Sequence, residues 1–171
     1  LACGGIVLHI LQGTRKMSTI RMYRSSDAIS LEQIDTFRKM LLTVIEDVRI
    51  VLIKIVDKLC TIRHLKSLEL EIQQVIARET LDIYAPLANR LGLGTIKWEL
   101  EDRAFFFLET DEYKKIAKSL GATRSEREDF LHDVMKQLSE ILRQYNLHAG
   151  VQGRVKHIYS IYKKLRNKGY S

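Results

Sequence analysis

Residues 47–63, DVRIVLIKIVDKLCTIR, contain the most regular helical pattern of the chain. Apolar side chains recur there at steps of three and four residues, at Val48, Val51, Leu52, Ile55, Leu59 and Ile62. Such spacing places them on one face of an amphipathic helix. Asp47 precedes this run, and an aspartate at that position accepts hydrogen bonds from the first N–H groups of a helix. The stretch therefore predicts a capped helix whose apolar face needs partner helices to cover it.

Helical periodicity continues through most of the remaining sequence. A capping-box pattern at Ser30 and Gln33 predicts a helix that runs to about residue 44. Apolar spacing predicts further helices over residues 68–85, 95–108, 110–121, 123–145 and 154–168. Pro86 should kink the first of these, and the glycines of residues 89–94 should form a turn before the second. Residues 1–30 lack clean periodicity, so we expect no defined element there.

The same patterns predict which side chains are buried. Trp98 should lie in the core, with the acidic residues around it on the outer face of the helix. The expected apolar faces of the segments 68–85 and 123–145 comprise Ile72, Val75, Ile76 and Ile83, and Phe130, Leu131, Val134, Leu138, Ile141 and Leu142. The small residues Ala85 and Ala88 indicate close packing between helices.

The rhythm changes at residues 147–153, LHAGVQG, where alternation predicts a short strand. A lone strand has no partner for its backbone groups, so this region should be poorly ordered or paired between chains. The pattern as a whole predicts a mainly α fold, in which a helical bundle is followed by one strand and a basic helix.

Composition supports a folded protein. The 171 residues suffice for one domain or parts of two, and 46% of them are hydrophobic. No apolar run approaches the roughly 20 residues of a membrane span, and no secretion signal is evident, so we expect a cytoplasmic location. Cys3 and Cys60 are far apart and are not spaced as metal ligands, which is typical of free thiols in a reducing compartment.

The net charge of +7 favours phosphate-bearing partners, and its location is informative. The last eighteen residues, from Arg154 onward, contain six basic and no acidic side chains. On one helix, Lys156, Ser160 and Lys164 would line one face at intervals of four residues. Arg154 would stand at the helix start, after Gly153. Guanidinium and ammonium groups and helix N-termini all bind phosphate oxygens, so we expect a phosphate site here. A solvated basic surface helix is the alternative.

Asp57 is the second candidate, because it lies among apolar neighbours within the helical stretch 47–63. An acidic residue in such a place can be a metal ligand, but the spacing favours a surface carboxylate paired with Lys54 or Lys58. A metal site needs several ligands, and the histidines are isolated in the sequence.

Four segments in series resemble the RelA/SpoT family of bacterial stringent-response enzymes, which synthesise and hydrolyse (p)ppGpp. They are residues 47–65, 84–92 (YAPLANRLG), 97–102 (KWELED) and 153–164 (GRVKHIYSIYKK). The resemblance covers residues 37–171 in the family's order. It implies that residues 1–108 are the C-terminal part of a degenerate, helical HD-type (p)ppGpp hydrolase domain with linking helices. Residues 109–171 would begin an α/β nucleotidyltransferase-like synthetase domain.

The resemblance also implies substrates, metals and site residues. Family synthetases are GTP pyrophosphokinases, transferases that move pyrophosphate from ATP to GTP or GDP with Mg²⁺. In this chain the ATP phosphates would be contacted by Arg154, Lys156, Ser160 and Lys164. Family hydrolases use Mn²⁺, and Asp57 falls at the position of one ligand, here as a vestige. Nucleotides are the implied partners. Ribosome binding would need other regions of the family's chain, and neither a membrane nor DNA is implied.

The chain also departs from the family pattern. The hydrolase motif Ala-Asp-Arg-Leu-His-Asn is VDKLCT at residues 56–61, so Thr61 replaces the Asn, and no His or His-Asp motif precedes it. Val155 replaces the proline that usually follows the arginine. The family's acidic magnesium ligands and guanine-stacking tyrosine would lie beyond Ser171. We therefore expect a fragment or truncated member that is catalytically incomplete by itself and binds no metal alone.

Two other functions remain open from the residues. One is a non-catalytic nucleotide-binding or regulatory module that binds its parent enzyme. The other is a basic helical RNA-binding protein, for which Tyr159 and Tyr162 supply aromatic rings interleaved with positive charge. The four-segment resemblance favours (p)ppGpp metabolism over both.

Overall fold

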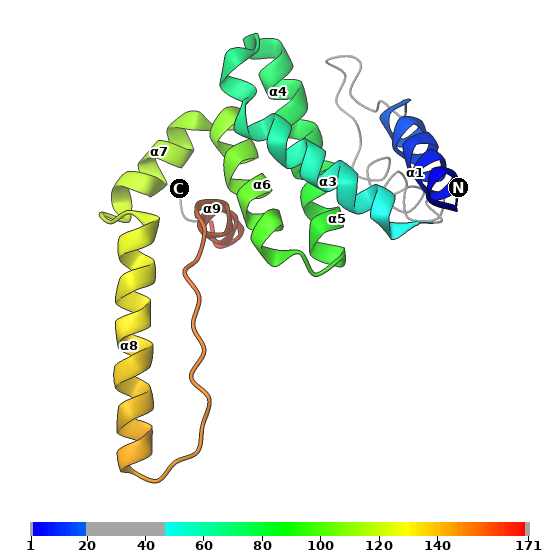
Figure 1. The fold of residues 1–171 in the computed structure, drawn as a ribbon. Coiled ribbons are helices and arrows are strands. Elements are labelled where there is room, and N and C mark those ends of the chain that lie inside the picture. The colour runs from blue at the N-terminus through cyan, green and yellow to red at the C-terminus, as the bar shows by residue number, and fades with distance from the viewer. Residues whose placement is uncertain (1, 20–46, 170–171) are drawn as a thin grey trace. The chain divides into compact units, whose positions relative to one another are not determined.

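The computed structural model describes residues 2–19 and 47–169, and every regular element within these ranges is helical (Figure 1). The α-helices are α1 Ala2–Thr19, α3 Val48–Arg63, α4 Leu70–Glu79, α5 Ala85–Arg90, α6 Gly94–Leu108, α7 Thr110–Ser119, α8 Arg124–Gln144 and α9 Ile158–Asn167. A 3-10 turn, η1, spans Leu65–Ser67, and a π-helical turn, η2, spans Thr80–Tyr84. The mainly α prediction is confirmed, while the helix expected over residues 30–44 lies outside the described residues.

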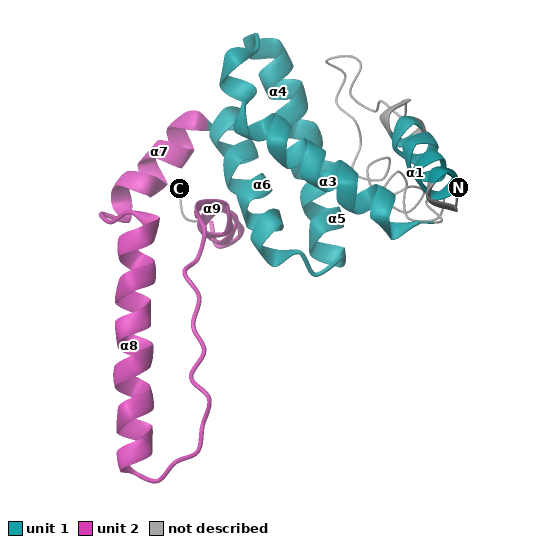
Figure 2. Cartoon of the chain, in the orientation of Figure 1, with its two compact units in different colours: residues 1–109 teal, residues 110–171 magenta. Residues whose placement is uncertain are grey.

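The chain divides into two compact units, residues 1–109 and residues 110–171 (Figure 2). In the part of the chain that the structure describes, no helix is both long and apolar enough to span a membrane.

Helix α3 begins where the sequence predicts. The carboxylate of Asp47 accepts the backbone N–H of Arg49 at 2.9 Å and also binds the Arg49 guanidinium, with a shortest distance of 2.6 Å. These hydrogen bonds lower the pKa of Asp47 from 3.8 to about 2. The carboxylate therefore stays charged, and so remains an effective cap, at all but strongly acidic pH.

The apolar face of α3 forms much of the core of the first unit. Its buried residues are Ile50, Val51, Ile55, Leu59 and Ile62. They pack with buried residues of the next helices, among them Leu87 and Leu100, and α6 contacts α3, α4 and α5. Val48 was predicted on this face but is exposed, because the first turn of α3 instead buries Ile50.

Helix α1 was not expected from the sequence. It forms over Ala2–Thr19 although Gly4 and Gly5 lie in its first turn. Its contact with α3 explains part of the discrepancy: a Cβ at Gly13 would overlap the Ile50 side chain, and Met17 is buried in the core. Tertiary packing of this kind outweighs the weak helix propensity of glycine.

The segment predicted as one helix before Pro86 is three elements. Helix α4 ends at Glu79, the π-helical turn η2 follows, and Pro86 lies in the first turn of α5. The Ala85 N–H donates to the Thr80 carbonyl, five residues back, and the Thr80 hydroxyl donates to Ile76 O at 2.6 Å. Proline cannot donate an N–H to the turn before it, which makes a wider turn tolerable there.

The predicted apolar face of this segment was only partly right. Ile83 is buried and Ile76 is half-buried, but Ile72 and Val75 are exposed. The buried positions of α4 and η2 include Ala77, Thr80 and Tyr84.

The acidic residues of α6 do not form the outer face that the sequence predicted. Glu101 is buried, at 8% exposure. Glu99 binds two guanidinium groups, Arg63 Nη2 at 2.7 Å and Arg103 Nε at 2.8 Å. Hydrogen bonds from Arg63 contribute most to lowering the pKa of Glu99. Glu99 therefore joins α3 to α6 as well as facing Arg103 on its own helix. Trp98, expected in the core, is half-buried.

The second unit is built on local signals that the sequence contains. Helix α7 is followed by Gly121, whose φ of +64° is a conformation that favours glycine. Helix α8 then begins with a reciprocal capping box between Thr123 and Glu126. The predicted apolar stripe of α8 is largely uncovered: Phe130, Leu138 and Ile141 are exposed, and no residue of α8 is fully buried.

Two predictions in this unit were wrong. Residues 147–153 form no strand, since the described residues offer no second strand for a ladder. The basic helix does not begin at Arg154: the backbone stays irregular through His157, and α9 begins at Ile158. Helix α7, rather than a sheet, contacts α9.

The core of the first unit makes a clear stability prediction. Ile55 is fully buried and Ile53, two residues earlier on α3, is 45% exposed. Ile55→Ala should therefore lower the free energy of unfolding by about 2–5 kcal/mol, whereas Ile53→Ala should change it by about 0.5 kcal/mol or less. Urea unfolding followed by the fluorescence of Trp98 measures both. Equal losses from the two variants would contradict the assigned face of α3.

Candidate functional site

Asp57 lies on the exposed side of α3, with 63% of its side chain accessible. Its carboxylate is 3.3 Å from Lys54 Nζ, and the Thr61 hydroxyl donates to the Asp57 carbonyl oxygen at 2.9 Å. The ion pair between Asp57 and Lys54 is one of the two that the sequence spacing allowed. No group of three or more His, Cys, Asp or Glu side chains in the described residues is arranged to hold a metal ion. The assignment of Asp57 as a vestigial ligand stays a prediction.

Lys58, the neighbour of Asp57 in the chain, contacts different residues from those that Asp57 contacts. Its ammonium group lies 2.8 Å from Glu79 Oε2 and 4.8 Å from the centroid of the Tyr84 ring. Burial raises the pKa of the Tyr84 hydroxyl, with a further contribution from nearby Glu79. This cluster could not be predicted from the sequence, because Lys58 and Glu79 are 21 positions apart.

The basic residues near the C-terminus occupy two kinds of backbone. Arg154 and Lys156 lie on the irregular segment 147–157, and both are exposed. Ser160 and Lys164 lie on α9, four residues apart and hence on one face. The predicted line of three donors along a single helix face is therefore wrong for Lys156. All four residues lie within residues 154–164 of the second unit.

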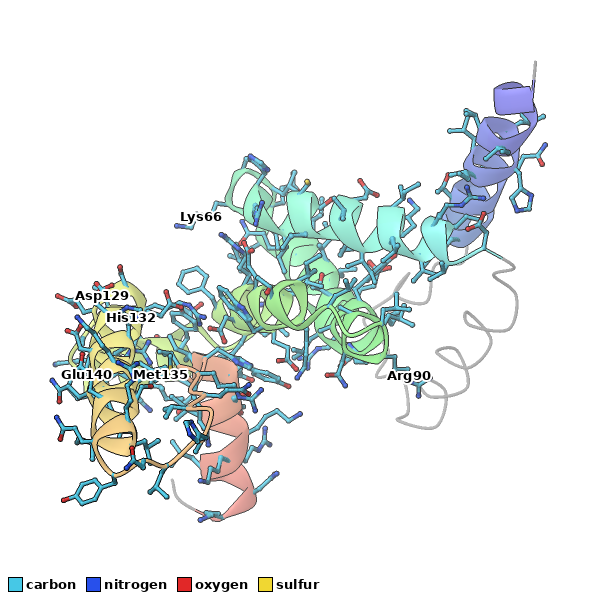
Figure 3. The ribbon with its side chains drawn as sticks, turned by 60° about the horizontal axis from the view of Figure 1, so that its bottom comes forward. Lys66, Arg90, Asp129, His132, Met135 and Glu140 are labelled. Atoms are coloured by element: carbon cyan, nitrogen blue, oxygen red, sulfur yellow. The ribbon has the colours of Figure 1, made fainter. Side chains whose placement is uncertain are left out.

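Contacts with α8 fix the irregular segment in place. A Cβ at Gly153 would lie 2.8 Å from Leu131 Cδ1 and 3.1 Å from the sulfur of Met135, and Met135 is labelled on α8 in Figure 3. The guanidinium of Arg127 donates to the carbonyl oxygen of Lys156 at 3.3 Å. These contacts give Gly153 a packing role that the sequence did not indicate.

Among the described residues, no carboxylate lies within salt-bridge distance of Arg154, Lys156 or Lys164. The ion pairs of the second unit lie within α7 and α8 instead, for example between Lys115 and Glu112. Unpaired cations on a short stretch of chain attract polyanions, and phosphate oxygens above all.

The aromatic residues of α9 are engaged with their own helix. Tyr159 and Tyr162 stack with their ring centroids 6.2 Å apart. Lys163 lies over the first ring at 5.5 Å and Arg166 over the second at 5.9 Å. Two further cations of the basic run are thus held against aromatic faces, while Arg154, Lys156 and Lys164 remain available for an anion.

Comparison with known proteins identifies the class of fold first. A family model described as HD domain matches residues 2–94, which is more than half of the chain. The helical first unit fits this match, and the chain is an HD-domain protein.

Curated relatives then identify the family. The chain is 42% identical over 166 residues to a GTP pyrophosphokinase of Photobacterium angustum and 40% identical over 167 residues to one of Escherichia coli K12. It is 40% identical over 160 residues to a probable guanosine-3′,5′-bis(diphosphate) 3′-pyrophosphohydrolase of Synechocystis. These alignments cover 93–96% of the chain but only 20–22% of each relative, so the chain spans about a fifth of their length. The chain belongs to the RelA/SpoT family.

Gly153 offers a test of how the basic segment is held. Gly153→Ala places a methyl group against Leu131 and Met135, so the segment or these side chains must shift, at a cost of about 1 kcal/mol. The matched control is Gly150→Ala, since a Cβ at Gly150 meets no atom within 4 Å. Methyl NMR signals of Leu131 and Met135 should move in the first variant and stay in place in the second. Unchanged signals in Gly153→Ala would show that the segment does not pack on α8.

Proposed function

We propose that this chain acts in (p)ppGpp metabolism as part of a protein that resembles a GTP pyrophosphokinase, the transferase that moves pyrophosphate from ATP to GTP or GDP. The names of its relatives support this class of reaction. The structural observation that supports it most is the basic stretch from Arg154 to Lys164. It is anchored to α8 through Gly153 and Arg127, and three of its cations have no carboxylate partner within residues 2–19 and 47–169.

The proposed role of this stretch is to bind the phosphates of ATP. The Arg154 guanidinium can form two parallel hydrogen bonds to a phosphate, and Lys156 and Lys164 add positive charge. The Ser160 hydroxyl, half-buried at the start of α9, supplies a short-range hydrogen bond. Binding and orienting the donor nucleotide is a large part of catalysis in phosphoryl-transfer enzymes.

The hydrolase side of the family's chemistry fits this chain poorly. The Lys54 ammonium beside Asp57 would repel a divalent cation, and Asp57 is the one family ligand position that the described residues supply. Thr61 stands where the family's hydrolases have Asn, and its hydroxyl donates a hydrogen bond to the Asp57 carbonyl oxygen. The residues present therefore do not fit Mn²⁺, and we assign no hydrolytic step to them.

The first functional prediction is that this chain alone does not hydrolyse ppGpp when Mn²⁺ is supplied. The expected result is no release of pyrophosphate above the rate without protein, because Asp57 is paired with Lys54 and Thr61 is committed to the backbone. Metal-dependent release that Asp57→Ala abolishes would contradict the prediction.

The second functional prediction is weak, salt-sensitive binding of nucleoside triphosphates at the basic stretch. Several charge-assisted hydrogen bonds would form, but long side chains must be ordered and the pocket is incomplete. We expect a Kd no tighter than roughly the millimolar range, about −4 kcal/mol. Binding should weaken as salt rises, since exposed charges are screened beyond about 10 Å at 0.1 M. ATP and GTP should bind about equally.

The double variant Arg154→Ala, Lys156→Ala should lose most of this binding in an NMR titration with ATP. The matched control is Lys136→Ala, Arg143→Ala, which removes the same charge from exposed positions on α8. If both double variants bind ATP equally, net charge alone explains the affinity. If the Arg154 and Lys156 variant binds like the unmodified chain, the basic stretch is only a solvated surface.

A further inference from the structure

Residues 147–157 run back along α8 as a stretch of chain without helical turns (Figure 1). Across residues 148–156, no backbone N–H or C=O group is bonded to another backbone group of the described residues. One side-chain contact is present, from the Arg127 guanidinium to the Lys156 carbonyl oxygen. Chain in this condition presents the same row of free donors and acceptors as the edge strand of a sheet.

Side chains alternate along this segment as they do along a strand. A Cβ at Gly153 would meet Leu131 and Met135 of α8, and Val151 and Val155, two residues to either side, are half-buried. The residues between them, 152 and 154, are exposed and belong to the opposite face. One face of the segment is therefore packed on α8, while its backbone edges are open in the part of the chain that the structure describes.

An uncovered apolar stripe on α8 lies beside the segment. It comprises Phe130, Leu138 and Ile141, all of which are exposed. At 3.6 residues per turn, this side of the helix is roughly a quarter turn away from the side that carries Leu131 and Met135. A chain that pairs with the nearer edge of the segment is therefore placed to cover the stripe as well.

The residues of the segment are suited to pairing with a second copy of themselves. In an antiparallel pair centred on Gly153, Val151 lies opposite Val155 and Gln152 lies opposite Arg154. Apolar residues then face each other on the α8 side, and no two like charges are directly opposite on the other side. A pair centred on Arg154 would set the two guanidinium groups opposite each other, which is destabilising. The register centred on Gly153 is therefore favoured.

We propose that residues 150–156 and α8 form an interface with a second copy of this chain. The two segments pair as antiparallel strands about Gly153, and the two-fold symmetry sets both α8 helices on the same face of the ribbon. The apolar stripe of each α8 packs against the α8 of the other copy. Arg154 and Lys156 lie on the opposite face, so this pairing leaves the candidate phosphate site open.

The first test measures the mass of the unmodified chain by sedimentation equilibrium, from about 10 µM to about 1 mM. The mean mass should rise with concentration from 19.9 kDa toward twice that value. Over the same range, hydrogen exchange should slow at amides of residues 150–156, because pairing supplies acceptors for them. A mass that stays at 19.9 kDa overturns the proposal and leaves the edge to a strand of another protein or of a longer chain. A dimer without slower exchange at these amides overturns it too.

Charge at residue 152 tests the register. Gln152→Arg places like charges opposite Arg154 at two symmetric positions and should weaken the dimer about fivefold. Gln152→Glu makes two opposite-charge pairs instead and should strengthen it about fivefold. Gln74→Arg and Gln74→Glu are the controls, since they change the net charge equally at an exposed position on α4. Equal effects at residues 152 and 74 would overturn the pairing about Gly153.

The stripe is tested by Ile141→Ser, which should weaken the dimer about tenfold because each copy loses an apolar contact. Ile72→Ser is the matched control, since Ile72 on α4 is 44% exposed and Ile141 is 48% exposed. The proposal falls if the two variants weaken the dimer equally or if neither weakens it. Circular dichroism checks that α8 still forms in Ile141→Ser, and hydrogen exchange in the unmodified chain decides the matter if it does not.

Discussion

Close approach of helices at buried alanines is the constraint on which the first unit depends. Ala77 of α4, Ala85 and Ala88 of α5 and Ala104 of α6 all have no accessible surface. A side chain that ends at Cβ can be fully covered only when neighbouring chain segments come very near, so these four positions bring α4, α5 and α6 together. Larger side chains such as Leu87 and Leu100 then fill the space around the alanines. The apolar face of α3 is buried because this surface exists for it to cover.

The π-helical turn follows from the same constraint. Ala77 and Ala85 must both face the core, with Pro86 directly after the second of them. The extra residue in each π turn shifts the phase of the helix, and Ile83 and Tyr84 reach the interior through that shift. Tyr84 in turn carries the Lys58 ammonium over its ring, which keeps a charged side chain satisfied at the edge of the core. A local irregularity near a proline thus sets the environment of the residue that follows Asp57.

The sequence predicted those features that depend on neighbours in the chain. The Asp47 cap, the start of α8 near residue 123 and the turn before α6, where Gly92 has a φ of +73°, are all local, and each is present. The features that it missed depend on distant partners. Glu99 is bound by Arg63, which is 36 positions away. Helix α1 packs on Ile50, and Gly153 packs on Leu131 and Met135 of α8. The segment 147–153 has the alternation of a strand, but alternation alone supplies no partner for its backbone. Of the candidate site, sequence could predict the residue types and their order, but not where α9 begins.

The two units differ in whether their charged side chains form ion pairs, and this difference bears on function. Around Asp57 each charge is met within the first unit: Asp57 by Lys54, Lys58 by Glu79, and Glu99 by Arg63 and Arg103. A metal ion arriving at Asp57 would have to replace the Lys54 ammonium, although an exposed ion pair of this kind contributes little to stability. Around α9 the opposite holds, because Arg154, Lys156 and Lys164 have no acidic partner among the residues that the structure describes. An anion that binds them displaces water from both partners and orders exposed side chains, but it breaks no ion pair of the described residues. The arrangement of charges therefore favours phosphate binding in the second unit over phosphate binding near Asp57.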